Sequence, residues 1–393
     1  MKILLVSSYL PYPLYSGGHI RLYNLLQELS KNNEITLVCE ARKDQTASDI
    51  EVVKKLVKEL HVFPRKKQWS LETITKTGIS ENAFLITGHN LPEMKALVTR
   101  LLIKEAFDVI HVETSYVLQN VPKTNIPIIL TEHNLEYKVY EKYVNAAPFI
   151  IRPILRIDVK KLKKQEEIYW KQVSFVVAVS EHEKNSIAQF TNKVGVVPNG
   201  VDIHAFKLKK YKDTGNHKQV LFIGDFRWIQ NRDTAVYILE HIWPKIIQKI
   251  PSATLRIVGK NIPDALIRLH NKSSVIFSKN TNENTQDIFS GANMLLSPIR
   301  VGGGTQYKIL EAMAVGTPVV TNTLGSVGLL VSHNKNILIG NTTEELANLT
   351  AEVLESNALA MKIGVNSRKL IEKEYSWKTI AKSLEQIYKN VRL

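Results

Sequence analysis

A glycine-rich loop with a helical pattern directly behind it contains the residue types best suited to chemistry in this chain. The loop consists of Gly302, Gly303, Gly304 and Thr305. Glycines allow the backbone to come close to a ligand, and the unpaired N–H groups at a helix start favour an anion such as phosphate. Lys308 and Glu311 follow three residues apart and therefore share one helical face. A cation for phosphate beside a carboxylate for hydroxyls predicts a site for a nucleoside diphosphate.

The residues after this loop resemble the nucleotide-sugar signature of the retaining GT-B glycosyltransferases called family 4, or glycosyl transferases group 1. Residues 310–314 read LEAMA and residues 316–320 read GTPVV, which match that signature. The resemblance implies that Glu311 holds the ribose hydroxyls of a nucleotide-sugar donor. The signature has an earlier glutamate, which would fall at Gly303, and this chain follows a glycine-rich version of the loop found in some relatives.

A second glycine pair, Gly17 and Gly18, lies between the first predicted strand and the first predicted helix. That position is at the carboxyl edge of an open α/β sheet, where ligands bind. Relatives carry a Gly-Gly pair and a helical arginine here, which corresponds to Arg21. The resemblance implies that Gly18 approaches the donor, with Gly17 and Arg21 as candidates for the acceptor side; a structural role for Arg21 stays open.

His133 and Glu136 follow another predicted strand, again at its carboxyl end. A histidine can donate a hydrogen bond or gain charge near neutral pH. Relatives have a His-Asn-x-Glu stretch here whose histidine faces the donor sugar, so the resemblance makes His133 the first candidate for an active-site residue in this part of the chain. Glu136 is a candidate for orienting the segment or contacting the acceptor, and His111 and Glu113 are secondary candidates.

A basic pair that many relatives use to bind the donor diphosphate is missing, because Asp225 and Gln230 occupy its positions. The stretch resembles instead a branch with the pattern Gly-x-x-x-Trp-x-x-Asn. Desolvated phosphates require compensating charge, for which Lys308 is the leading candidate, followed by Arg227 and Arg300. The sequence contains no Asp-x-Asp pair and no His/Cys cluster with metal-ligand spacing, which predicts a reaction without a metal or other cofactor.

Alternating strand and helix patterns must position these residues. Near-continuous apolar runs, typical of parallel strands covered on both faces, occur first at residues 3–6, 35–39, 109–112, 128–130 and 175–179. A second set follows at residues 220–223, 254–258, 275–277, 294–297, 318–321 and 337–339. Two consecutive sets predict an α/β protein with two Rossmann-like, doubly wound domains. The resemblance implies the GT-B arrangement, in which the two domains face a central cleft.

The domain boundary is predicted at the Asn-Gly turn at residues 199–200, which breaks regular structure. Residues 1–198 would form an acceptor domain and residues 199–376 a donor domain. In GT-B enzymes a terminal helix crosses back to the first domain, and residues 377–393 are predicted to do so here.

The overall composition is that of a globular protein, since 44% of the 393 residues are hydrophobic and 23% are charged. No apolar stretch reaches the roughly 18 residues needed to span a bilayer. The single cysteine, Cys39, allows no internal disulfide. These features predict a cytoplasmic protein.

The net charge of +15 is compatible with nucleic-acid binding, with attraction to an anionic membrane, or with a generally lysine-rich protein. No nucleic-acid-binding motif is present, so that class is not expected. Residues 151–172 are rich in Lys and Arg and place Leu155, Val159, Leu162 and Tyr169 roughly on one helical stripe. The stripe indicates either an interfacial membrane helix or a helix packed on the core, and peripheral contact with the inner face of the cell membrane stays open.

Together these patterns predict a retaining, metal-independent hexosyltransferase-type enzyme that uses a nucleoside diphosphate sugar and a carbohydrate or lipid-linked acceptor, in cell-surface polysaccharide or glycolipid synthesis. His133, Lys308 and Glu311 are its predicted catalytic residues. Two alternatives remain: a non-catalytic nucleotide-sugar-binding subunit of the same fold, and a sugar-nucleotide epimerase.

Overall fold

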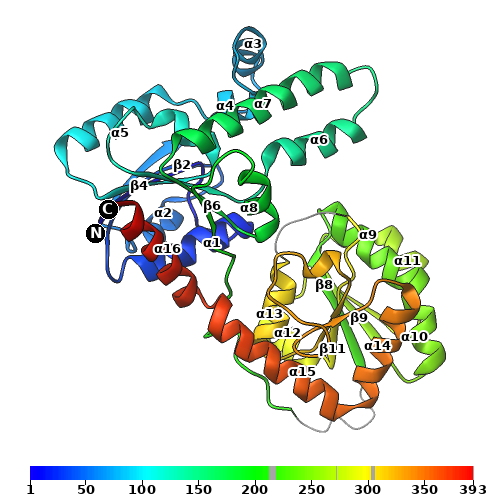
Figure 1. Cartoon of the computed structure of the whole chain (residues 1–393). Coiled ribbons are helices and arrows are strands. Elements are labelled where there is room, and N and C mark those ends of the chain that lie inside the picture. Colours follow the sequence, from blue (N-terminus) through cyan, green and yellow to red (C-terminus); the bar gives the residue numbers. More distant parts are fainter. Residues whose placement is uncertain (212–217, 271, 302–305, 393) are drawn as a thin grey trace. The chain divides into compact units, whose positions relative to one another are not determined.

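The chain forms two compact α/β units, each with its own parallel sheet (Figure 1). The computed structural model describes residues 1–211, 218–270, 272–301 and 306–392. One unit comprises residues 1–199 and 380–393, and the other comprises residues 200–379. The division expected after residue 198 falls next to this boundary, while the roles of the units as acceptor and donor domains stay predictions.

The first unit is built on a seven-stranded sheet in the order β3-β2-β1-β4-β5-β6-β7, with every neighbouring pair parallel. Its strands are β1 (Lys2–Ser7), β2 (Glu34–Ala41), β3 (Glu59–Pro64), β4 (Val109–Glu113), β5 (Ile128–Glu132), β6 (Phe175–Ala178) and β7 (Val194–Val196). The residues of β1, β4 and β5 are almost all buried, as expected for central strands covered by helices on both faces.

The helices of the first unit pack on this sheet and against each other. They are α1 (Gly17–Leu29), α2 (Ala47–Lys54), α3 (Leu71–Ile79), α4 (Phe84–Gly88), α5 (Pro92–Lys104), α6 (Glu136–Ala146), α7 (Arg152–Gln172) and α8 (Glu181–Ile187). The carboxylate of Glu166 on α7 accepts hydrogen bonds from the backbone N–H groups of Glu136 and Tyr137, both at 2.9 Å. Because these donors have no partner inside α6, Glu166 fixes the start of α6 and the segment just before it.

The second unit has a six-stranded parallel sheet in the order β10-β9-β8-β11-β12-β13. Its strands are β8 (Gln219–Asp225), β9 (Thr254–Lys260), β10 (Val275–Lys279), β11 (Met294–Leu296), β12 (Val319–Thr321) and β13 (Leu338–Ile339). The surrounding helices are α9 (Ile229–Tyr237), α10 (Trp243–Lys249), α11 (Asp264–Leu269), α12 (Thr285–Gly291), α13 (Tyr307–Val315), α14 (Thr343–Glu355) and α15 (Asn357–Leu370). The predicted doubly wound α/β class is therefore confirmed, and each strand expected from an apolar run is present.

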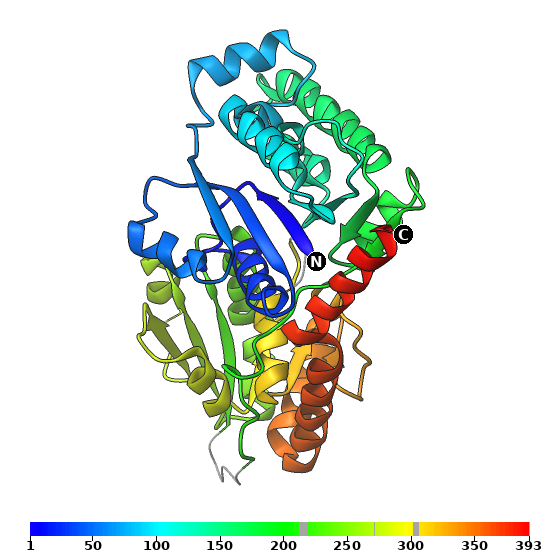
Figure 2. The ribbon, with the colours of Figure 1, turned by 90° about the vertical axis from the view of Figure 1, so that its left-hand side faces the viewer.

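The last helix, α16 (Trp377–Arg392), is one continuous helix, red in Figures 1 and 2, that begins in the second unit and continues into the first. From Ile380 onward it belongs to the first unit, where Ile380, Leu384 and Tyr388 are buried. These side chains are spaced four apart and form the apolar face that anchors the helix.

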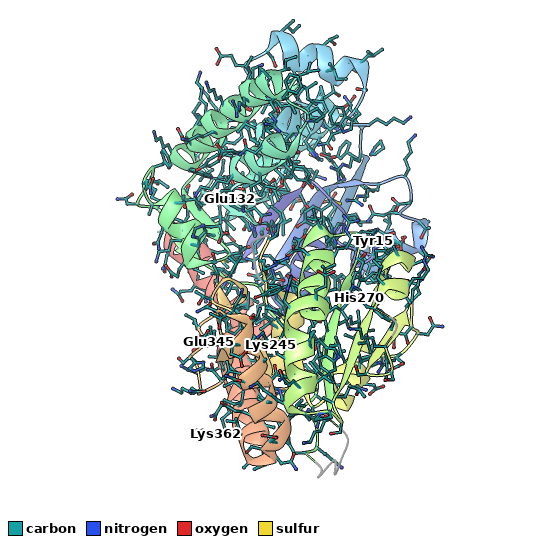
Figure 3. All side chains as sticks on the ribbon, turned by 90° about the vertical axis from the view of Figure 1, so that its right-hand side faces the viewer. Tyr15, Glu132, Lys245, His270, Glu345 and Lys362 are labelled. Carbon is teal, nitrogen blue, oxygen red and sulfur yellow. The ribbon has the colours of Figure 1, made fainter. Side chains whose placement is uncertain are left out.

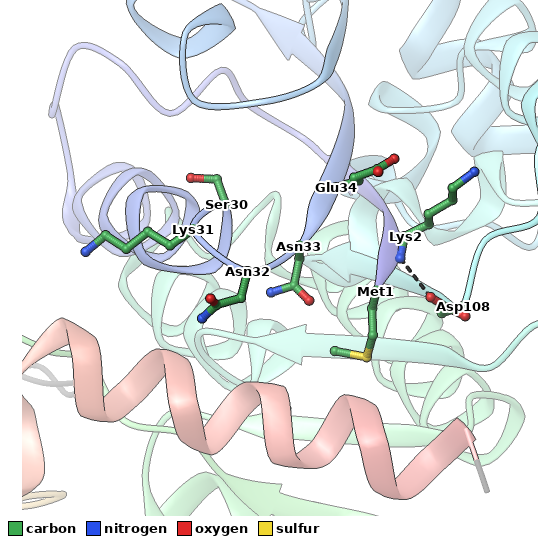
Figure 4. A pocket seen from close by; sticks show the side chains of 8 residues that line it. All are labelled: Met1, Lys2, Ser30, Lys31, Asn32, Asn33, Glu34 and Asp108. Atoms are coloured by element: carbon green, nitrogen blue, oxygen red, sulfur yellow. Dashed lines mark hydrogen bonds between the residues drawn. The ribbon is translucent and has the colours of Figure 1, made fainter.

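A shallow depression of about 460 Å³ lies at the amino ends of β1 and β2 (Figure 4). Asp108 lies there, and its carboxylate accepts a hydrogen bond of 2.7 Å from the backbone N–H of Lys2. None of the predicted site residues lines this depression. Ligands of open α/β sheets bind at the opposite, carboxyl edge, where Glu113 ends β4.

Candidate active site

The strand order of each sheet reverses at one point, and the predicted residues gather at the carboxyl ends of the strands beside it. The reversal lies between β1 and β4 in the first unit and between β8 and β11 in the second. Such a reversal leaves a crevice outside the carboxyl ends of the two strands, where open α/β sheets bind ligands. The glycine pair follows β1 and Glu113 ends β4 in the first unit, whereas Asp225 ends β8 in the second unit.

In the second unit, Lys308 points inward onto residues of β8 and α9. Its Nζ donates a hydrogen bond of 2.5 Å to Oδ1 of Asn231 and lies 4.6 Å from the ring centroid of Phe222. The hydrogen bond and the cation–π contact hold the ammonium group at the strand-order reversal. Sequence reasoning assigned no role to Asn231, although the Gly-x-x-x-Trp-x-x-Asn pattern contained the signal for it.

Asn231 is itself held tightly by the turn after β8. Its Nδ2 donates to the backbone oxygen of Asp225 at 2.8 Å, and its backbone N–H donates to that of Trp228 at 3.1 Å. A Cβ on Gly224 would lie 2.7 Å from Cγ of Asn231, so a larger residue at 224 would displace the amide. The glycine, the turn and the asparagine thus form one support for Lys308.

Lys308 and Glu311 both titrate near neutral pH. Burial raises the pKa of Glu311 to about 7, opposed by the charge of Lys308. Burial likewise lowers the pKa of Lys308 to about 7, opposed by the charge of Glu311. A bound dianion would favour the charged form of Lys308. The charged fraction of Lys308 is therefore highest when a diphosphate is bound.

The arginines predicted to assist Lys308 are engaged elsewhere in the described structure. Arg227, expected at the donor, pairs with Asp225 at 2.7 Å on the surface. Arg300 pairs with Asp233 at 2.7 Å and lies over the ring of Tyr237. The predicted loop residues Gly302, Gly303, Gly304 and Thr305 lie outside the described residues. Both arginines are thus paired with an aspartate, whereas the ammonium group of Lys308 is held by the uncharged Asn231 and Phe222.

In the first unit, the predicted His133 lies beside Glu113, the last residue of β4. Nε2 of His133 is 2.8 Å from Oε1 of Glu113 and 3.3 Å from the hydroxyl of Tyr9. The Glu113 side chain is fully buried, whereas that of His133 is 15% exposed. Thr114, which follows Glu113 along the chain, has a φ of 76°. This backbone conformation is energetically costly for a β-branched residue, and it occurs directly after the end of β4.

Two further side chains surround Glu113. Nε2 of His111 lies 3.1 Å from Oε2 of Glu113, and Nδ1 of the same ring lies 2.5 Å from the hydroxyl of Tyr388 on α16. Nε of Arg21 lies 3.9 Å from Oε1 of Glu113. His111 and Glu113, the secondary candidates, are thus joined to His133 in one buried cluster.

Arg21 and the glycine pair have clear structural contacts. Arg21, predicted on the acceptor side, is fully buried and donates to the backbone oxygen of Pro198 at 2.7 Å. A Cβ on Gly18 would lie 3.0 Å from the hydroxyl oxygen of Tyr9. Gly17 and Gly18 form the first residues of α1. Arg21 therefore makes a structural contact with the end of this unit, and its role on the acceptor side stays a prediction.

Glu136 is the first residue of α6 and is largely buried. Burial raises its pKa, although hydrogen bonds with Tyr116 and Asn134 oppose the rise. Glu132, labelled in Figure 3, is the last residue of β5 and accepts a hydrogen bond of 3.0 Å from Nε1 of Trp170. These contacts tie Glu136 and the strand end to the interior, so His133 sits in a segment that is fixed on both sides.

Comparison with known proteins identifies the family. Residues 217–356 match the family model Glycosyl transferases group 1, and residues 15–205 match the model Glycosyltransferase Family 4. The two matches together span most of the chain. This chain belongs to the glycosyltransferases of group 1, family 4.

The glycosyltransferase is 22% identical over 403 residues to an uncharacterized 44.6 kDa protein in the cps region of Klebsiella pneumoniae, and the match covers 98% of each chain. It is 27% identical over 211 residues to a phosphatidyl-myo-inositol mannosyltransferase of Mycobacterium tuberculosis, with 50% of this chain and 53% of that one covered. Among solved structures, Anabaena HepE in complex with UDP has a TM-score of 0.67 at 16% identity and covers 99% of this chain and 100% of its own. This structural likeness confirms the GT-B fold class.

No group of three or more His, Cys, Asp or Glu side chains in the described part of the glycosyltransferase is arranged to hold a metal ion. None of its helices combines the length and the apolar character required to cross a bilayer.

Proposed function

We propose that this glycosyltransferase moves a hexosyl group from a nucleoside diphosphate sugar to an acceptor hydroxyl with retention of configuration. The observation that carries the proposal is the cation of Lys308, held on Asn231 at the strand-order reversal and one turn from Glu311. Anabaena HepE, which shares the fold, was solved with UDP, and this supports a nucleotide-sugar donor here.

The proposed mechanism assigns one task to each of the three residues. The leaving diphosphate gains negative charge as the glycosidic bond breaks, and Lys308 with the N–H groups at the start of α13 stabilises that charge. Glu311 holds the ribose hydroxyls. His133 forms a hydrogen bond with the transferring sugar. Lys308 and the helix start neutralise the diphosphate in place of a metal, so the reaction is proposed to proceed in the presence of a chelator.

The acceptor is proposed to be a carbohydrate or a lipid-linked carbohydrate in the synthesis of cell-surface polysaccharide or glycolipid. Support comes from the Klebsiella pneumoniae relative, which is described as a protein in the cps region and aligns over 98% of each chain. Support for a lipid-linked acceptor comes from the Mycobacterium relative, whose name gives phosphatidyl-myo-inositol as what it acts on.

An activity screen tests this function. The protein would be incubated with UDP-, GDP- and ADP-sugars, a lipid extract and EDTA, and the anomeric configuration of any product would be determined by NMR. Transfer with a retained configuration is expected. Binding without turnover would favour the non-catalytic subunit, conversion of the donor without an acceptor would favour the epimerase, and loss of transfer in EDTA would refute metal independence.

Peripheral contact with an anionic membrane is proposed through the turn that joins α6 to α7, two helices that pack side by side (Figure 1). The stripe predicted for this contact packs inward instead: Leu162 is buried, and Leu155, Val159 and Tyr169 are half-buried. Large apolar side chains are exposed around the turn, namely Tyr143, Phe149, Ile150, Ile154 and Ile157.

Cationic side chains flank these apolar residues on α7, namely Arg152, Arg156, Lys160, Lys163 and Lys164. Arg156 and Lys160 also line a groove of about 240 Å³ between α6 and α7 together with Val144 and Val159. Apolar side chains that enter the acyl boundary, with cations at the level of the headgroups, are the pattern of an interfacial anchor.

Sedimentation with vesicles tests this contact. The protein is expected to bind vesicles that contain phosphatidylglycerol and to be released by salt, and Ile150→Ser should weaken binding. Ile103→Ser is the matched control, because Ile103 lies on α5 in the same unit and is 81% exposed, compared with 73% for Ile150. Equal loss in both variants, or equal binding to uncharged vesicles, would contradict the proposal.

A further inference from the structure

The carboxylate of Glu113 is the centre of a buried polar cluster at the end of β4. Its side chain has no exposed surface, and His133, His111 and Arg21 surround it at 2.8, 3.1 and 3.9 Å. Burial alone would raise the pKa of Glu113, but the charge of His133, the hydrogen bond from its ring and the nearby His111 outweigh burial and hold the pKa well below its usual range. Glu113 is therefore ionised, and its charge requires donors that face it.

The position of the proton on His111 follows from its two neighbours. Nε2 faces both Oε2 of Glu113 and Oγ1 of Thr131, the latter at 2.8 Å. An unprotonated Nε2 would set a lone pair against the carboxylate, so Nε2 carries a proton. Burial raises the pKa of Tyr388 well above its usual value, and its O–H group donates to Nδ1. The hydroxyl of Tyr388 on the last helix thus sets the tautomer of His111.

The same argument places a proton on Nε2 of His133, which faces Oε1 of Glu113. Nδ1 of His133 has no hydrogen-bond partner among the described residues, and the ring is partly exposed. We propose that Glu113 is a positioning residue for His133: it fixes the Nε2 proton and the orientation of the ring, so that Nδ1 is presented to the donor sugar. Tyr388, through His111, holds Glu113 in this arrangement. This inference depends on the proposed function only in naming the donor sugar as the ligand of His133.

Other titratable groups near His133 interact with its ring less directly than Glu113 does. Glu136 at the start of α6 interacts with the same ring through its charge, but burial raises its own pKa and favours its neutral form. Burial, followed by the charges of Arg42, Arg65 and His133, lowers the pKa of His19 on α1 to about 4, so His19 is neutral near pH 7. Tyr9 is an uncharged neighbour, and Arg21 opposes a second cation. Among the described residues, Glu113 is thus the carboxylate that pairs with His133.

The ¹⁵N resonances of the His133 ring, measured by NMR, test the inference without any substrate. They would be assigned by their loss in His133→Gln. Glu113→Gln is expected to shift the Nε2 resonance of His133, because the charged acceptor of its proton is gone. Glu40→Gln is the matched control, because buried Glu40 accepts a hydrogen bond of 2.8 Å from Nδ1 of His89 in the same unit. An unchanged Nε2 resonance of His133 in Glu113→Gln, or an equal change in both variants, would overturn the inference.

Two measurements do not depend on the folding of Glu113→Gln. In the wild-type protein, ¹⁵N shifts should show a proton on Nε2 of both His111 and His133; a proton only on Nδ1 of His133 would overturn the inference. Tyr388→Phe should change the Nδ1 shift of His111, because the hydroxyl donor is gone. An unchanged shift would remove Tyr388 from the arrangement.

Kinetics then separate this inference from the proposed function. In the transfer assay, Glu113→Gln is expected to lower kcat by about tenfold or more with little change in KM for the nucleotide sugar, since the nucleotide contacts lie in the other unit. A rise in KM as large as the fall in kcat would indicate general damage to the protein and contradict a positioning role. A wild-type protein that transfers no sugar would refute the proposed function while leaving the NMR result for Glu113 intact.

Discussion

Lys308 depends on its surroundings for both its position and its charge. Asn231 and Phe222 hold its ammonium group, and burial lowers its pKa to about 7. Lys308→Met keeps most of the side-chain volume and removes the charge. We expect kcat/KM for the nucleotide sugar to fall by about 10²-fold or more, because one preorganised contact to the developing charge is lost.

Lys362→Met is the control for this prediction. Lys362 lies on α15 in the same unit, is exposed and is labelled in Figure 3. Steady-state kinetics of both variants would be compared with the wild type. Activity that is unchanged in Lys308→Met, or reduced equally in both variants, would remove Lys308 from the proposed mechanism.

The titration of Lys308 also predicts how nucleotide affinity depends on pH. A diphosphate raises the pKa of an adjacent ammonium group, so binding takes up a proton wherever Lys308 is neutral in the free protein. Affinity for UDP should therefore fall as the pH rises above about 7, by up to about tenfold per unit.

Calorimetry in buffers with different ionisation enthalpies would measure the proton uptake directly. Lys308→Met should lose the part of the pH dependence that comes from the lysine. Affinity that is constant between pH 7 and pH 9 in the wild type would be incompatible with a cation that must be charged on binding.

At the scale of the elements, the close contact of β8 with β9 is critical for the support of Lys308. Gly224 and Gly259 are paired in the sheet, and a Cβ on Gly259 would lie 1.9 Å from the backbone oxygen of Gly224. Gly259→Ala must therefore shift one strand and with it the turn that carries Asn231. We expect the free energy of unfolding to fall by about 1–3 kcal/mol, measured by urea unfolding.

Gly291→Ala is the matched control, since Gly291 ends α12 and a Cβ there would meet no atom within 4 Å. Its free energy of unfolding should be unchanged or slightly raised, because alanine loses less conformational freedom than glycine on folding. Equal stability of the two variants would show that the strands can separate without cost.

The central strands were predictable from the sequence because both of their faces are buried, which produces continuous apolar runs. Two strands at the edges of the first sheet were not predicted: β3 is only half-buried and ends in a proline, and β7 consists of three residues including a glycine. Edge strands bury fewer side chains, so no continuous run marks them.

Part of the candidate site was also predictable, for a different reason. His133, Lys308 and Glu311 stood in motifs that resemble those of a family. Their partners depend on tertiary contacts, since Asn231 lies 77 residues from Lys308 and Glu113 lies 20 residues from His133. The spacing of residues along the chain does not reveal such contacts, and the structure supplies them.

At the scale of the whole molecule, the division into two units predicts two separable responses. If the second unit holds the nucleotide, UDP at about 100 times its Kd should stabilise residues 200–379 by about 2.7 kcal/mol. Leu384 on α16 is fully buried in the first unit. Leu384→Ala should therefore destabilise that unit by about 2–5 kcal/mol, although α16 begins in the second unit.

Hydrogen exchange measured by mass spectrometry can follow both units in one sample. UDP should slow exchange at α13 and around Asn231, and Leu384→Ala should speed exchange in β1 and β4 while leaving the UDP effect in place. Because α16 is continuous across the boundary, a destabilisation that spreads equally to both units would mean that the helix couples them into one cooperative system. Protection by UDP in the first unit alone would contradict the assignment of the nucleotide to Lys308 and Glu311.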